Sequence, residues 1–269
     1  MSTVKIPPSW LSRRINIVLI GCGGTGSEML DELFRIHSLL VALDGEGLHV
    51  TAFDPDSVSQ ANIGRQRFWP CDTGFPKAEV LISRVNSFGG ADWDYVNEAY
   101  DVEQHSNIEF DLLITCVDTP AIRADIGKYF QKSSSLNTEE VDDIDFDDFG
   151  SSSSRFWLDC GNDESSGNVI LGHLEWNGRD QKLPNVFDLY PVLASMQNSD
   201  QPSCSTAAAL AKQDYGVNRS VAREGANILW QFLRHGTLSH HGSYIDIKSG
   251  TVIPLRIDTS VWETFKQTA

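Results

Sequence analysis

The fold of this chain is decided by residues 15–27, which read INIVLIGCGGTGS. The short run 15–20 is apolar and rich in β-branched residues, as is typical of a strand buried on both faces. Glycines follow, and apolar side chains then recur at roughly helical spacing over residues 29–43. A second strand is predicted over residues 49–56, HVTAFDPD. Strand, glycine loop, helix and strand in this order predict a nucleotide-binding, Rossmann-like α/β fold with a mostly parallel sheet and flanking helices.

The glycine loop favours phosphate binding for a physical reason. Glycines allow backbone N–H groups to approach a phosphate at the start of the following helix, where the helix dipole also favours an anion. Asp54, at the carboxyl end of the second predicted strand, is expected to accept hydrogen bonds from a ribose. The loop alone does not distinguish ATP from a nicotinamide cofactor.

Length, charge and composition narrow the class of protein. At 269 residues the chain could form one large domain or two small ones, and we expect a single domain over residues 1–269. A formal net charge of −16 would repel a phosphate backbone, so nucleic-acid binding is not expected. The sequence contains neither a secretory signal pattern nor a run long enough to cross a bilayer, so we expect a cytoplasmic protein without membrane association. Five cysteines without a Cys-x-x-Cys pair predict reduced thiols and no structural zinc.

Further elements follow from local patterns. Pro7-Pro8 should prevent a regular helix in residues 1–14, an arm that either packs on its own chain or reaches a neighbour. A helix is predicted over residues 77–85, and a strand over 110–117 is followed by a helix from Pro120 to Phe130. The predicted elements nearer the end are a strand at 156–161 with a partner at 168–172, a helix at 218–235 and a terminal antiparallel hairpin within 243–257.

Two segments interrupt this pattern. Residues 133–154 place serine runs around clustered acids and offer too little apolar area to offset the entropy of ordering, so we expect a disordered acidic insertion. A cation-binding loop is the alternative, but the carboxylates are irregularly spaced and the acidic run lacks a turn glycine. Residues 177–202 are polar and punctuated by prolines, which predicts a crossing loop that leads to Cys204.

The motifs, taken in order, resemble those of the ThiF/MoeB superfamily of ATP-dependent activating enzymes, which includes the ubiquitin-activating enzymes. They are Gly21-x-Gly-Gly-x-Gly26, Asp54-x-Asp56-x-Val58, Asn62-x-x-Arg65-Gln66, Gly74-x-x-Lys77-Ala78 and Asp118. This set is more specific than the glycine loop, because Arg65-Gln66 followed by Lys77 has no counterpart in nicotinamide dehydrogenases. Nearly the whole chain outside the insertion also resembles the ThiF-like family of the PRTRC gene cluster, a set of genes often carried on plasmids. That likeness is carried by residues 62–66, 157–159, 202–205, 213–214, 218, 248–250 and 254–255.

The resemblance implies ATP and Mg²⁺ as ligands and assigns roles within the motifs. Asn62, Arg65 and Lys77 would contact the phosphates, while Asp118 would hold Mg²⁺ near the α-phosphate. Adenylation brings a carboxylate against an anionic phosphate, so fixed positive charge and a metal suit the chemistry. Read singly, an arginine or lysine is usually a solvated surface charge, and Asp118 before Pro120 is often a helix cap. The residues expected to bind the nucleotide are Gly21, Gly23, Gly24, Gly26, Asp54, Asp56, Asn62, Arg65, Gln66, Lys77 and Asp118.

Cys204 and the N-terminal arginines stay open at this stage. The resemblance places Cys204 where several superfamily members carry a cysteine that takes the activated carboxyl group, and a helix start there would lower its thiol pKa. The competing interpretation is a small buried apolar residue. Relatives form homodimers and lend an arginine to the neighbouring subunit's ATP, but neither Arg13 nor Arg14 matches that arginine in register. We therefore expect a homodimer without assigning a shared catalytic arginine.

The sequence thus predicts an enzyme that adenylates the C-terminal carboxylate of a small ubiquitin-like (β-grasp) protein with a glycine-ending tail. Arg65, Lys77 and Asp118 would serve catalysis, and Cys204 would then receive the acyl group as a thioester. One alternative is a nucleotide-binding scaffold of a plasmid-borne system that lacks turnover. A second is a nicotinamide-dependent oxidoreductase, which would share the loop and Asp54 but have no use for Lys77.

Overall fold

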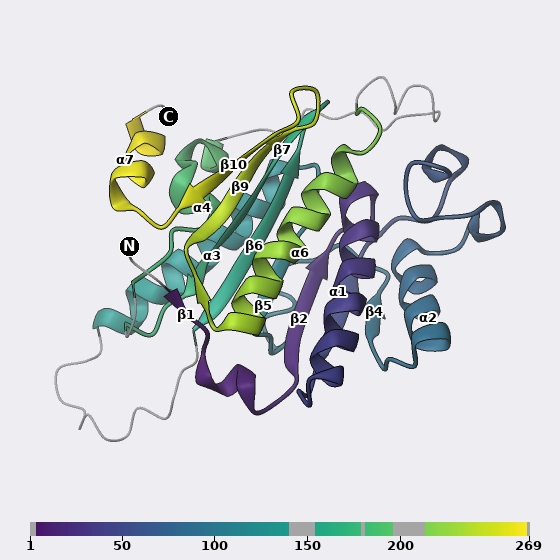
Figure 1. Cartoon of the computed structure of the whole chain (residues 1–269), viewed down its shortest axis with the longest axis horizontal. Coiled ribbons are helices and arrows are strands. Elements are labelled where there is room, and N and C mark those ends of the chain that lie inside the picture. Colours follow the sequence, from purple (N-terminus) through teal and green to yellow (C-terminus); the bar gives the residue numbers. More distant parts are fainter. Residues whose placement is uncertain (1–3, 140–153, 179–180, 196–212, 268–269) are drawn as a thin grey trace.

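An eight-stranded sheet runs through the centre of the computed structural model, which describes residues 4–139, 154–178, 181–195 and 213–267 (Figure 1). The strand order is β10-β9-β7-β6-β5-β2-β3-β4, parallel from β4 to β6 and antiparallel from β6 to β10. The predicted Rossmann-like fold with a C-terminal antiparallel extension is therefore confirmed. The strands are β2 (Ile15–Ile20), β3 (Leu48–Phe53), β4 (Asp94–Val96), β5 (Leu112–Thr115), β6 (Arg155–Asn162), β7 (Ser166–Glu175), β9 (His240–Asp246) and β10 (Thr251–Arg256).

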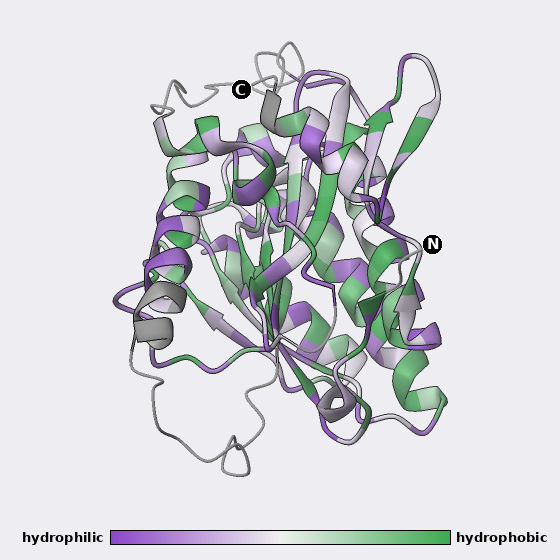
Figure 2. Cartoon of the chain, turned by 90° about the vertical axis from the view of Figure 1, so that its left-hand side faces the viewer, coloured by the Kyte–Doolittle hydropathy of each residue, from purple (hydrophilic) through white to green (hydrophobic). Residues whose placement is uncertain are grey.

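Helices cover both faces of the sheet, as the edge-on view of Figure 2 shows. In Figure 1, α1 and α6 lie side by side in front of the sheet, and α3 lies behind it. Helix α2 packs on α1 and β4, and α4 packs between α3 and β7. The α-helices are α1 (Gly24–Ala42), α2 (Lys77–Gly89), α3 (Pro120–Glu139), α4 (Val186–Leu189), α6 (Val217–His235) and α7 (Thr259–Gln267).

The central strand β2 lies between two parallel neighbours. Ile17 is in register with Val50 of β3 and Leu112 of β5, and all three side chains are buried. A strand enclosed on both faces and both edges favours apolar residues at nearly every position, which explains the apolar run that only Asn16 interrupts. Because parallel strands end at the same sheet edge, the loops after β2, β3 and β5 are brought together.

The N-terminal arm packs on its own chain. Strand β1 (Val4–Lys5) pairs with β8 (Thr237–Leu238), and the 3-10 helix η1 (Pro8–Leu11) follows. Trp10, 4% exposed, meets the rings of Phe156 and Phe232 edge to face. Residues 4–11 of the arm therefore pack on their own chain, the first of the two alternatives.

Several element boundaries differ from the predictions. Helix α3 continues to Glu139, so residues 133–139, predicted to begin the insertion, are helical, while 140–153 lie outside the described residues. The predicted strand 110–117 is shorter and forms only β5. The predicted crossing loop contains α4 and the 3-10 helix η4 (Pro191–Ser195), because Asn185 caps α4 by accepting from two backbone N–H groups. No helix within the described ranges is long and apolar enough to span a membrane.

Candidate functional site

The glycine loop joins β2 to α1 and leaves the helix start open. Gly21 has φ +91° and lies against the Cys116 carbonyl, so a side chain there would be strained. A Cβ at Gly26 would overlap the Gly21 carbonyl oxygen, which requires the second glycine. Gly23 is the N-cap of α1 and supplies no side-chain cap. The first backbone N–H groups of α1 are therefore available to an anion.

Asp54 holds this loop in place. Its Oδ2 accepts a hydrogen bond from the Cys22 N–H at 2.6 Å, and its Oδ1 accepts one from the Asp56 N–H at 2.8 Å. The side chain is buried, and burial raises the pKa of Asp54, while the Lys77 charge opposes that shift. Each carboxylate oxygen has a second lone pair, so the predicted acceptance of ribose hydroxyls remains chemically available. The loop-holding role was not predicted.

Lys77 begins α2 and lies buried beside the same loop. Its Nζ donates to Oδ2 of Asp56 at 2.7 Å, and its N–H donates to the Asp56 carbonyl at 2.9 Å. Lys77 is 7% exposed, whereas the Asp56 side chain is 66% exposed. The Lys77 charge also lowers the pKa of Asp54 and of Cys22, although burial raises both overall. The ammonium group is therefore close to the glycine loop, and Asp56 serves as its partner.

The segment after β3 supplies Asn62, Arg65 and Gln66. A 3-10 turn, η2 (Gln60–Asn62), is fixed by Asn62, whose Oδ1 accepts from the N–H and hydroxyl of Ser59 at 2.8 and 3.0 Å. Arg65 donates from Nη1 to Oε1 of Gln213 at 3.0 Å. The Gln66 amide lies against Gly23, with its Nε2 3.9 Å from the position a Cβ would take there. The turn thus places Gln66 at the open start of α1 and Arg65 against Gln213, which lies just before α6.

Two polar atoms in this segment are buried without a partner among the described residues: Nε of Arg65 and Oε1 of Gln66. Burial lowers the pKa of Arg65, and the nearby charge of Asp118 opposes that shift. A buried polar atom without a hydrogen bond costs free energy, so such atoms are expected where a ligand completes the site. Both belong to residues that the motifs assign to nucleotide binding.

Asp118 follows β5 at the same sheet edge and is exposed to solvent. It lines a cavity of about 660 Å³ at the ends of β5 and β6, together with Arg123 and Asp159. Arg123 donates from Nε to Oδ1 of Asp159 at 2.6 Å and from Nη2 to the Val117 carbonyl at 3.0 Å. Because Arg123 is already hydrogen-bonded to Asp159 and to the Val117 carbonyl, it forms part of the cavity wall and is not available to pair with a ligand.

A single carboxylate suits Mg²⁺ bound to a nucleotide. Mg²⁺ keeps several waters and usually takes one or two protein carboxylates together with phosphate oxygens. Asp118, exposed beside the Arg65 charge, fits that arrangement. Among the side chains that the structure describes, no three His, Cys, Asp or Glu residues gather as a metal-binding cluster.

Asn218 and Asn162 belong to this site but were not predicted to have a role in it. The Thr25 hydroxyl donates to Oδ1 of Asn218 at 3.0 Å, and Nδ2 of Asn162 donates to the same oxygen at 2.5 Å. A Cβ at Gly24 would lie 2.5 Å from Nδ2 of Asn218, so that glycine makes room for the asparagine. The sequence marked Asn218 only as part of the family likeness and as a residue near the start of a predicted helix, and its partner Thr25 lies 193 positions away.

Of the predicted residues, the structure brings those from Gly21 to Asp118 to one edge of the sheet, whereas Cys204 lies outside the described residues. Cys22 and Cys160 are buried. Arg13 donates to Asp111 at 2.5 and 2.6 Å and Arg14 to Asp92 at 2.7 and 2.9 Å, both around the start of β2 and away from the site. Neither arginine therefore reaches the glycine loop of its own chain.

The model of the ThiF family matches residues 11–207. The fold is similar to that of E. coli MccB solved with ATP, with a TM-score of 0.55, 15% sequence identity and coverage of 90% of this chain. It is also similar to PaaA, with a TM-score of 0.58, 12% identity and coverage of 90% of this chain. This chain spans 64% of the length of each of those proteins. MccB has also been solved with MccA, at the same coverage and TM-score 0.55. No curated protein sequence matches the chain.

Proposed function

This chain belongs to the ThiF family, and from that membership we propose that it uses ATP to adenylate the C-terminal carboxylate of a small ubiquitin-like protein. One observation carries the proposal. Gln66 lies against Gly23 at the uncapped start of α1, Lys77 is buried next to the same loop, and the buried Nε of Arg65 has no partner among the described residues. Phosphate oxygens over the loop would accept hydrogen bonds from the N–H groups of α1, from Lys77 and from the Nε of Arg65.

The reaction would proceed by one displacement at phosphorus. A carboxylate oxygen of the partner attacks the α-phosphorus, and the bond from that phosphorus to the bridging oxygen breaks. Pyrophosphate leaves with the bonding electron pair, and the product is an acyl adenylate. The N–H groups of α1, with Arg65 and Lys77, would stabilise the charge on the phosphates, and Asp54 would hold the ribose.

Asp118 would hold Mg²⁺, which would supply positive charge against the phosphate oxygens. The cavity that Asp118 shares with Arg123 opens at the ends of β5 and β6, so it offers a path for the partner's extended tail to reach the α-phosphate. Cys204 would take the acyl group from the adenylate as a thioester, releasing AMP. A homodimer is expected from family membership, and a PRTRC gene cluster is the expected genetic setting.

Solved structures of MccB with ATP and with MccA are consistent with a nucleotide and a second component on this fold. A scaffold that binds ATP without turnover is the second candidate. It is favoured by the ion pair between Lys77 and Asp56 at 2.7 Å, because this contact engages the lysine that adenylation would need at the phosphates.

The decisive experiment is ATP–pyrophosphate exchange with a purified protein from the same gene neighbourhood whose tail ends in glycine. We expect exchange that depends on this partner and is lost in Lys77→Met but kept in Lys128→Met, a matched change of an exposed lysine on α3. ATP binding without exchange for every such partner would support the scaffold. Cys204→Ser should keep exchange and lose the thioester; exchange lost in that variant would count against the assigned order of steps.

A further inference from the structure

Residues 117–119 connect β5 to α3 and carry Asp118 next to the glycine loop. The sheet ends before them, because Thr115 is the last residue of β5 in register with β2 and β6. Val117 lies against Gly21, with its Cγ1 3.2 Å from the position a Cβ would take there. The Asp118 carboxylate is therefore carried by an irregular segment, and sheet pairing does not fix its position.

Arg123, in the first turn of α3, holds this segment on both sides of Asp118. Its Nη2 donates to the Val117 carbonyl at 3.0 Å, and its Nη1 donates to the Thr119 carbonyl at 3.5 Å. Nη2 also donates to the Cys160 carbonyl on β6 at 3.4 Å. A planar guanidinium group presents its N–H donors in a fixed fork, so one side chain can bind several carbonyls at once. The neighbours of Asp118 are thus tied to β6.

Asp159 fixes the guanidinium group of Arg123. Its Oδ1 accepts from Nε of Arg123 at 2.6 Å and also from the Thr115 hydroxyl. Nε1 of Trp157 donates to that hydroxyl at 2.8 Å, so the network continues into the core. The side chains of Arg123 and Asp159 are only 9% and 2% exposed. A buried ion pair contributes little net stability by itself, so stability alone is a weak reason for this arrangement.

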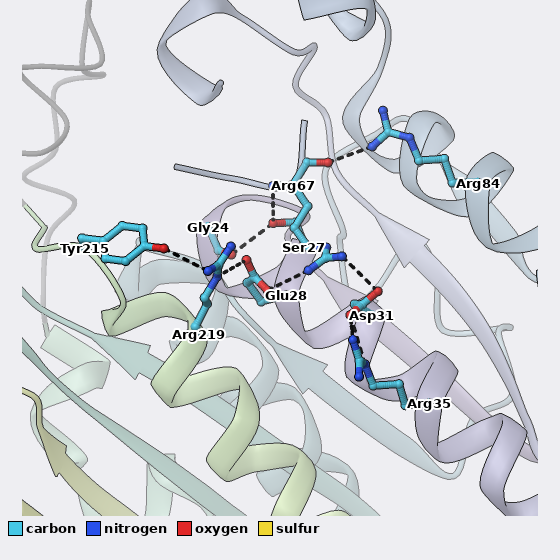
Figure 3. Close-up of polar contacts among 9 residues, drawn as sticks. All are labelled: Gly24, Ser27, Glu28, Asp31, Arg35, Arg67, Arg84, Tyr215 and Arg219. Atoms are coloured by element: carbon cyan, nitrogen blue, oxygen red, sulfur yellow. Dashed lines mark hydrogen bonds and ion pairs between the residues drawn. The ribbon is translucent and has the colours of Figure 1, made fainter. Parts of the chain in front are cut away.

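A second carboxylate holds the other side of the glycine loop. Oε1 of Glu28 accepts from Nε of Arg219 at 3.0 Å, and its Oε2 accepts from Nη1 of Arg67 at 3.3 Å (Figure 3). The Arg67 N–H donates to the Ser27 hydroxyl at 3.3 Å, which keeps the segment after η2 on α1. The two ion-pair networks share no residue, so each can be changed alone.

We propose that Arg123 is a positioning residue that fixes the Asp118 carboxylate for Mg²⁺, an inference that rests on the proposed function. An exposed carboxylate on an irregular segment loses conformational freedom when it binds a metal, and that loss weakens binding. Arg123 lowers this cost because it already holds both neighbours of Asp118. Groups that orient a metal ligand without touching the metal typically change metal affinity by about 10–100-fold.

The test measures how much Mg²⁺ strengthens ATP binding. Calorimetry with ATP in Mg²⁺ and in EDTA gives the ratio of the two affinities for the full chain and for each variant. Arg123→Lys keeps the charge beside Asp159 but cannot bind the carbonyls on both sides of Asp118, so we expect this ratio to fall by about tenfold. ATP binding in EDTA should stay within about twofold, because metal-free ATP makes no use of that carboxylate. Hydrogen exchange of residues 117–119 should become faster in the same variant.

Three variants serve as controls. Arg13→Lys makes the same change at the opposite end of the sheet, where Arg13 pairs with the buried Asp111, and it should leave the ratio unchanged. Glu28→Gln loosens the second network and should weaken ATP binding in Mg²⁺ and in EDTA alike. Asp118→Asn removes the charge of the metal ligand and should abolish most of the strengthening by Mg²⁺.

Two results overturn the positioning role. One is a ratio in Arg123→Lys equal to that of the natural chain, and the other is a lower ratio without faster exchange of residues 117–119. A melting temperature close to that of the natural chain checks that the variant folds. If it does not fold, Asp159→Asn tests the same role, because it removes the charge that holds Arg123 and should also lower the ratio.

The outcomes separate this role from the adenylation reaction. If the ratio depends on Arg123 but no partner supports pyrophosphate exchange, the adenylation proposal fails and the positioning role stands. If the natural chain binds ATP equally well with and without Mg²⁺, the positioning role fails, while partner-dependent exchange still decides the adenylation proposal. If the natural chain binds no nucleotide, both fail.

Discussion

Asp54→Asn probes the interaction that fixes the glycine loop. In the natural chain, each oxygen of Asp54 accepts one backbone N–H, from Cys22 and from Asp56. Asparagine has one carbonyl oxygen and one NH₂ group, so one of those N–H groups would face another donor. A buried polar group left without a partner costs about 1–3 kcal/mol of the free energy of unfolding.

An opposing effect has to be subtracted. Burial raises the pKa of Asp54, so above that pKa the folded protein holds an anion that is less well solvated than in the unfolded chain. Asparagine removes this penalty, and it also removes the attraction to Lys77. Because both contacts are short and charge-assisted, and one is lost while the other becomes neutral, we expect the hydrogen bonds to outweigh the relief of burial and the variant to lose roughly 1–2 kcal/mol.

Urea denaturation at pH 7, followed by tryptophan fluorescence, measures the change, with Asp56→Asn as the control. Asp56 is two-thirds exposed, so its variant should lose no more than about 1 kcal/mol. Asp54→Asn should also bind ATP more weakly, because the loop and the ribose share the lost acceptor. An Asp54→Asn protein as stable as the natural one, or more stable, would refute the reasoning.

Three further predictions follow from other contacts. Lys77→Met should lower pyrophosphate exchange by about a hundredfold or more yet change the free energy of unfolding little, because its partner carboxylate is exposed to solvent; a rate within threefold of the natural one would contradict this. Gly26→Ala should lower the free energy of unfolding, measured in urea, by about 3 kcal/mol or more, because its Cβ would overlap the Gly21 carbonyl. Gly90→Ala meets open space and should lower it by only about 1–2 kcal/mol, because of the positive φ of Gly90. Equal losses in the two variants would argue against the overlap. Burial lowers the pKa of His173 and of His241 to about 4, below the unfolded value of about 6.5. The stability that the two neutral side chains contribute is therefore present above pH 6.5 and is lost as the pH falls toward 4. Urea denaturation at pH 7, 6 and 5 should show a decreasing free energy of unfolding, and a constant value would contradict this.

The sequence predicted the parallel core of the fold because local patterns determine it. Residues 15–20 and 112–115 are apolar at every position except Asn16 and Thr115, as is typical of strands enclosed on both faces. The patterns were weaker elsewhere. Strand β4 has only three residues, and α7 is a short polar helix at the end of the described chain. Serines in residues 133–135 suggested a break, whereas α3 continues through them, since serine disfavours a helix only weakly.

The candidate site was predictable where one motif contains the residue, and less so where two distant segments meet. The spacing of Arg65, Gln66 and Lys77 marked them, although their roles remain predictions. The hydrogen bond between Thr25 and Asn218 joins residues far apart in the chain, and so does the buried pair of Arg123 with Asp159. Such pairings depend on tertiary packing, which a single sequence does not specify.

Glu28 carries a consequence for how sequences of this kind diverge. It is nearly inaccessible, and each of its two oxygens engages an arginine from a different segment of the chain. Replacing Glu28 with a neutral residue would leave Arg67 and Arg219 without the carboxylate that separates their charges. Replacing both arginines would leave a buried carboxylate without a partner. Positions 28, 67 and 219 should therefore covary among related proteins, a pattern that an alignment of natural sequences would reveal without any biochemical assay.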